Sequence, residues 1–202
     1  MALERYLMRR LVDGMAGWAT FYQASRANRH YDEHLFYQHI ESLACGRQWR
    51  VSQQHRILGP AQRGAPSTID FVIFRDSSYA DTQPGLALVE VKYLRGSNPS
   101  QDLRELRRDI DKLRAVEPDR LASSSQLMAC GRPLRFLLIF AQEAGLDALK
   151  GCETRIHRDV AAMVEQARTG DHKNIYRASM GTYLNTSLEW VIIAIAEQRW
   201  PP

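Results

Sequence analysis

Three charged residues interrupt two stretches of sequence that are otherwise strongly apolar. Asp70 lies within residues 68–74 (TIDFVIF), and Glu90 and Lys92 lie within residues 86–93 (LALVEVKY). Buried carboxylates and ammonium groups are costly unless they pair with one another or hold a metal ion. The chemistry that these residue types indicate is therefore either a metal site or an ion-pair cluster.

Strand periodicity places these charges on defined faces, because side chains alternate between the two sides of a strand. Glu90 and Lys92 share a face with Leu86 and Leu88, and Asp70 shares one with Thr68, Val72 and Phe74. Both faces of 86–93 begin apolar, which is typical of a central strand covered on both sides. If the two strands pair antiparallel through loop 76–85, Asp70 lies close to Glu90 and Lys92.

Simpler interpretations exist for each charged residue taken alone. A Glu-x-Lys pair is most often a solvated ion pair, and an Asp at a strand start is often a turn cap. The combination favours a site, because both charged positions interrupt strands that read as buried. The first strand also offers polar side chains that could face the same cleft, with nothing to choose among them: Gln53, Gln54, His55 and Arg56.

The periodicities predict one domain, residues 1–202, of mixed α/β (α+β) class, with a mixed central sheet flanked by helices. An N-terminal helical extension (1–30) precedes a core (31–141), and a helix and a strand follow (142–202). The expected elements are helix 32–45, strands 49–58, 67–74 and 86–94, helix 97–115, strand 135–141, helix 153–168 and strand 189–197. The order is thus α-β-β-β-α-β followed by α-β, with an extra N-terminal helix.

The motifs STIDFVI (67–73) and VEVK (89–92), in this order of elements, resemble the PD-(D/E)XK phosphodiesterase superfamily. That superfamily has the restriction-endonuclease-like fold. Pro66 does not directly precede Asp70, so the literal Pro-Asp pair is absent. The resemblance covers the second helix through strand 135–141 and points to no particular subfamily. It implies a metal-dependent nuclease, most simply a DNA endonuclease.

The resemblance also implies roles for individual residues. Asp70, Glu90 and the backbone carbonyl of Val91 would hold Mg²⁺, with Mn²⁺ as a substitute, because hard oxygen ligands suit these ions. Lys92 would position the attacking water or stabilise charge on the phosphoryl oxygens. The family often adds a Glu from the preceding helix; Glu33 fits that placement better than Glu41, although an acid in a first turn also simply offsets the helix dipole.

Composition sets wider bounds. Lys plus Arg number 27 against 23 Asp plus Glu, a mild basic bias that suits a nucleic-acid partner without requiring one. Three scattered cysteines give no zinc spacing and favour a reducing, cytoplasmic location. No signal peptide or membrane segment is expected. A homodimer or a larger protein complex is compatible with the short chain.

Helix 97–115 carries several cations that could contact phosphates, but acids interleave with them, and the charge pattern favours a solvated, salt-bridged face. Two alternatives to a nuclease stay open. One is a catalytically inactive protein of the same fold that binds nucleic acid or a protein partner. The other is an interaction domain in which Asp70, Glu90 and Lys92 form only a structural cluster.

Overall fold

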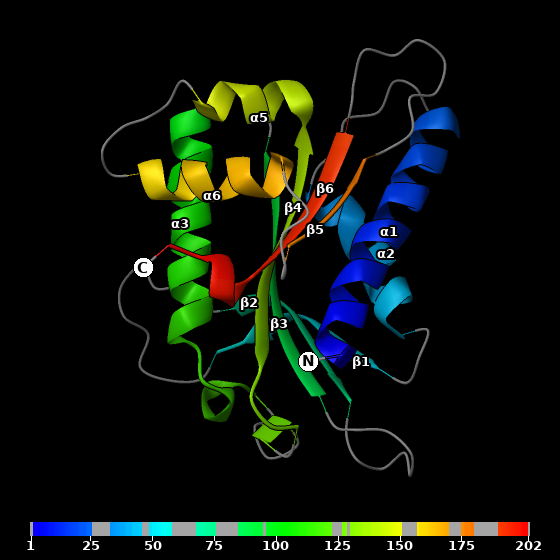
Figure 1. The fold of residues 1–202 in the computed structure, drawn as a ribbon. Coiled ribbons are helices and arrows are strands. Elements are labelled where there is room, and N and C mark those ends of the chain that lie inside the picture. The colour runs from blue at the N-terminus through cyan, green and yellow to red at the C-terminus, as the bar shows by residue number, and fades with distance from the viewer. Residues whose placement is uncertain are drawn as a thin grey trace.

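A computed structural model of the chain describes residues 2–25, 33–45, 49–57, 68–75, 85–94, 96–122, 127–128, 130–150, 157–169, 175–179 and 190–201. Six strands form one mixed sheet between two layers of helices (Figure 1). The helices are α1 (Ala2–Ser25), α2 (Glu33–Cys45), α3 (Pro99–Ala115), α5 (Glu143–Lys150) and α6 (Arg158–Thr169), with short 3₁₀ turns η1 (Pro118–Arg120) and η2 (Glu197–Arg199). The strands are β1 (Arg50–Arg56), β2 (Thr68–Arg75), β3 (Gly85–Leu94), β4 (Leu134–Gln142), β5 (Ile175–Ser179) and β6 (Trp190–Ala196).

The strand order across the sheet is β1-β2-β3-β4-β6-β5. β1, β2 and β3 pair antiparallel, and β4 then pairs parallel with β3 after the chain has crossed over through α3. β6 and β5 complete the sheet in antiparallel pairings. The mixed sheet flanked by helices is as predicted, and so is the central position of β3.

Each face of the sheet has its own hydrophobic core. On one face Leu86 and Leu88 of β3 pack beneath α3, α5 and α6; on the other, Ala87 and Val89 pack beneath α1 and α2 (Figure 1). The apolar residues of α1 lie in this second core, so α1 is an integral layer rather than an appended extension. Helix α1 continues through Gly14, and Leu43 of α2 occupies the space that a side chain at this position would need.

Helix α3 begins where the sequence indicates. The Asn98 side chain accepts a hydrogen bond from the Gln101 amide, and Pro99 occupies the first turn. The helix buries a stripe of Leu103, Leu106, Ile110 and Leu113. The turn before it requires glycine: Gly96 has a φ of 71°, and a Cβ there would lie 2.4 Å from the Gly145 Cα of α5.

Two elements of the C-terminal third were not predicted, namely α5 and β5. Helix α5 is only 8 residues long and follows β4 directly, so its periodicity is short. β5 is an edge strand of 5 residues with polar positions (IYRAS), which carries little hydrophobic pattern. The predicted helix 153–168 is observed as Arg158–Thr169.

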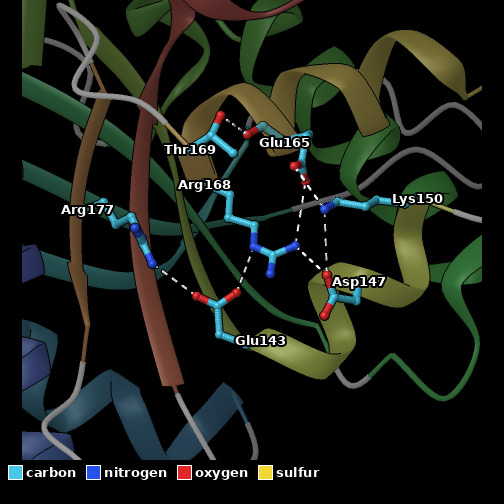
Figure 2. A network of polar contacts seen from close by, with 7 residues as sticks. All are labelled: Glu143, Asp147, Lys150, Glu165, Arg168, Thr169 and Arg177. Atoms are coloured by element: carbon cyan, nitrogen blue, oxygen red, sulfur yellow. Dashed lines mark hydrogen bonds and ion pairs between the residues drawn. The ribbon is translucent and has the colours of Figure 1, made fainter.

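A network of ion pairs joins α5, α6 and β5 (Figure 2). The Arg168 guanidinium of α6 contacts the Glu143 carboxylate at 2.7 Å and the Asp147 carboxylate at 2.6 Å, both on α5. Arg177 of β5 donates to the other Glu143 oxygen at 3.0 Å. Glu143 and Arg168 are each less than a fifth exposed, so solvent screens their ion pair only weakly and the network holds the three elements together.

Among the described residues, no helix is both long and apolar enough to cross a membrane.

Candidate functional site

A pocket of about 300 Å³ lies between β3 and α3, on the sheet face that α3 covers. It contains the three charged residues singled out by the sequence: Asp70, Glu90 and Lys92. The pocket is lined by Asp70, Glu90, Val91, Lys92, Gln101, Arg104, Glu105, Arg108, Asp109 and Lys112. Charged and polar groups therefore dominate its wall, in contrast to the apolar cores beside it.

Asp70 and Glu90 lie where the β2–β3 ladder stops. The last paired residues are Phe71 and Val89, and beyond them side-chain carboxylates accept the hydrogen bonds of the backbone. The Asp70 amide donates to Glu90 Oε1 at 3.2 Å, and the Val91 amide donates to Asp70 Oδ2 at 2.9 Å. The two acids are thus joined through the backbone and face the same pocket.

Gln54 of β1 holds the remaining oxygen of Asp70. Its side-chain amide donates to Asp70 Oδ1 at 2.9 Å and its carbonyl accepts from Thr68 at 3.0 Å. Gln54 has a φ of 46°, a left-handed conformation that is costly for a residue with a side chain. Such strain is found where a surrounding structure fixes a functional geometry. Gln54 is the member of the 53–56 group that reaches the site.

Two ion pairs link β3 to α3; they are called crossed here because the strand supplies the base in one pair and the acid in the other. Lys92 of β3 pairs with Glu105 of α3, and Glu90 of β3 pairs with Lys112 of α3. All four side chains are partly or fully withdrawn from solvent, with Glu90 only 2% exposed. The sequence had indicated that Lys92 would lie against Asp70 and Glu90. In the structure Lys92 pairs with Glu105, and Lys112 contacts Glu90.

The environment of Glu90 perturbs its protonation. Burial, and then the negative charge of Asp70, raise the pKa of Glu90 well above its usual value, against the opposing effect of Lys112. The Lys92 ammonium has the contrary effect on Glu105, whose pKa is lowered. The pocket therefore holds two carboxyl groups whose pKa values are shifted in opposite directions.

The sequence analysis offered Glu33 or Glu41 as a third acid, and neither is among the described side chains that line this pocket. Glu41 faces β1, where it accepts a hydrogen bond from Gln53. Glu33 is the first residue of α2, and its side chain lies outside the described residues. The described acids that line the pocket are Asp70, Glu90, Glu105 and Asp109.

The cations of α3 divide into two groups on the two flanks of its buried stripe. Arg107 pairs with Asp111 and with Asp159 of α6, and Arg114 donates to the carbonyl of Pro201, so both fasten neighbouring elements. The other flank carries Arg104, Arg108 and Lys112 into the pocket wall. The predicted solvated, salt-bridged face is thus correct for part of the helix and wrong for Lys112, which is 10% exposed.

Sequence reasoning missed Glu105 and Lys112. A signal was present, because the two residues lie about two turns apart and share one flank of α3. Their partners could not be chosen, since the same acids and bases also satisfy helical i, i+3 and i, i+4 spacings. Only the placement of α3 over β3 makes the crossed pairs.

Comparisons with protein-family models, with curated proteins and with solved structures gave no significant match to this chain. Within the described part of the chain, no cluster of three or more His, Cys, Asp or Glu side chains forms a metal-binding group. The functional argument therefore depends on the pocket and on its residues.

Proposed function

We propose that this protein is a Mg²⁺-dependent nuclease that hydrolyses phosphodiester bonds in DNA. The observation that carries the proposal is the position of Asp70 and Glu90. They lie on neighbouring strands, linked through the Asp70 amide at 3.2 Å, and open into one pocket that also contains Lys92.

The arrangement of the sheet supports the resemblance to the PD-(D/E)XK superfamily. Three antiparallel strands, a crossover helix and a fourth strand parallel to the third follow one another in the order that the resemblance implies. The motif residues occupy β2 and β3 of this unit. A restriction-endonuclease-like core is therefore part of the proposal.

The donor set fits Mg²⁺. Asp70 and Glu90 offer carboxylate oxygens, and Val91 lines the same pocket and can offer its backbone carbonyl. Mg²⁺ is commonly bound through one or two carboxylates while it keeps several waters, so the set need not be larger. Bound Mg²⁺ would polarise the phosphate and make a water more acidic.

The chain's own residues would then position the substrate. Lys92 is the cation on β3 beside the acids, and a phosphoryl oxygen could replace Glu105 as its partner. An ammonium directed at oxygens that gain charge during hydrolysis stabilises the transition state. Arg104 and Arg108 line the outer wall and are exposed, where they could bind the phosphates on either side of the cleaved bond.

A cleavage assay with a matched control tests this function. Wild-type protein should cut DNA with Mg²⁺ or Mn²⁺ but not with EDTA, and Ca²⁺ should support binding with little cleavage. Asp70→Ala should abolish both metal binding and cleavage. Asp13→Ala, which removes an exposed acid of α1, should change neither. Activity that survives in Asp70→Ala, or absence of any activity and metal binding in the wild type, would refute the proposal.

One observation favours the alternative of a non-catalytic module on the same fold. Glu90 and Lys92 already have partners on α3, so the crossed pairs would serve as a structural cluster without a metal. This alternative predicts DNA or protein binding that is indifferent to Mg²⁺ and EDTA. Measurements of cleavage and of binding with Mg²⁺ and with EDTA therefore separate the two functions.

A further inference from the structure

Glu90 would be a ligand of the proposed metal site, yet its carboxylate already forms an ion pair with Lys112. Glu90 Oε1 accepts a hydrogen bond from the Asp70 amide, and Glu90 Oε2 pairs with the Lys112 ammonium. Asp70 likewise has both oxygens engaged, by Gln54 and by the Val91 amide. Of these four partners only Lys112 carries charge, so it is the one that a divalent cation would repel.

A second partner for the Lys112 ammonium already lies beside it. Asp109 is at i−3 on the same helix, with its Oδ1 at 3.9 Å from Lys112 Nζ. The Asp109 side chain is 16% exposed and lines the same pocket. A lysine has a flexible four-carbon stem, so its ammonium can shift from Glu90 to Asp109 without movement of the backbone.

We propose that Lys112 is a resident counter-cation of the site, which holds Glu90 while the metal is absent and transfers to Asp109 when a divalent cation binds. This inference rests on the proposed metal site, but not on DNA cleavage. In it, α3 supplies both the cation that fills the site and the acid that receives this cation. Metal binding then becomes an exchange of one cation for another at Glu90.

The proposal predicts that removal of the lysine tightens metal binding. Lys112→Met keeps an unbranched side chain and removes the competing charge, so its dissociation constant for Mn²⁺ at pH 8 should fall by about tenfold or more, the scale of one nearby charge. Arg114→Met is the matched control, because it removes a cation of the same helix from the flank outside the pocket, where it donates to the Pro201 carbonyl. Its dissociation constant should change by no more than about threefold.

The receiving acid is tested by a second pair of variants. Asp109→Asn should weaken Mn²⁺ binding, because the displaced ammonium loses its second partner. Asp111→Asn removes an acid from the opposite flank of α3, where it pairs with Arg107, and should leave the affinity unchanged. Isothermal titration of EDTA-treated, dialysed protein measures all of these constants without any substrate.

Equal or weaker Mn²⁺ binding by Lys112→Met than by wild type would overturn the exchange while leaving the proposed nuclease intact. Absence of Mn²⁺ binding in both proteins would overturn the exchange and the metal-dependent function together. If Lys112→Met failed to fold, Lys112→Gln would replace it, because its neutral amide still donates to Glu90. Lys112→Gln should then bind Mn²⁺ more tightly than the wild type does.

Discussion

Replacement of Glu90 by glutamine should change how stability depends on pH. Glu90 is 2% exposed, and burial and the Asp70 charge raise its pKa well above the usual value. In the unfolded chain a glutamate titrates near pH 4.3. Between that pH and the raised folded value, the folded protein binds more protons than the unfolded chain. Its free energy of unfolding must therefore fall as pH rises through this window.

The size of the effect follows from proton linkage. One group that is protonated when folded and ionised when unfolded lowers the free energy of unfolding by at most about 1.4 kcal/mol per pH unit. For a chain of this size that corresponds to a fall in Tm of about 3–6 °C per unit. Glu90→Gln cannot ionise, so this slope should be missing from its profile.

Urea unfolding in EDTA from pH 5 to pH 8 measures the difference directly. Glu105→Gln is the matched control, because Lys92 lowers the pKa of Glu105, and the contribution of Glu105 is lost only as pH falls below its ordinary range. Its profile should run parallel to the wild type above pH 6. Parallel profiles for wild type and Glu90→Gln would refute the argument that burial dominates at Glu90.

Four further changes test other parts of the structure. Lys92→Met should lower DNA cleavage by about a hundredfold while metal still binds, as turnover and titration together would show. Arg108→Met should weaken DNA binding and reduce the slope of log affinity against log salt by about 1, if Arg108 contacts one phosphate. Arg168→Met should cost about 2 kcal/mol in urea unfolding through its lost charged hydrogen bonds, whereas Arg9→Met, at an exposed pair, should cost less than about 0.5 kcal/mol. Gly96→Ala should cost at least about 2 kcal/mol in the same assay, because an L side chain is strained at its φ and meets Gly145.

Much of the fold followed from hydrophobic pattern alone. β3 alternates between two apolar faces, and α3 carries a regular buried stripe, so both were predicted nearly to their ends. β5 was missed because an edge strand with polar positions leaves no such pattern. Helix α5 was missed because its short sequence, with Gly145 inside it, has little periodicity of its own.

The site was predictable to the extent that it lies on paired strands. Asp70 and Glu90 meet through one antiparallel register, and the alternation along each strand indicates which face each side chain occupies. The roles of Gln54, Glu105 and Lys112 depend on how a third strand and a helix pack onto that pair. Such contacts between elements are not encoded in local spacing, and several partners were equally compatible with the sequence.

The crossed pairs between β3 and α3 also specify how far the helix lies along the strand. A slide of one turn, about 5.4 Å, would place Arg108 opposite Glu90 but would leave Lys92 facing the neutral Gln101. A slide in the other direction would place the apolar Val116 opposite Glu90. Each displaced alignment leaves a partly buried charge without its counterpart, which is strongly unfavourable. The charges therefore select one axial position of α3 along β3. The apolar stripe of α3 is uniform, so it discriminates poorly between positions one turn apart.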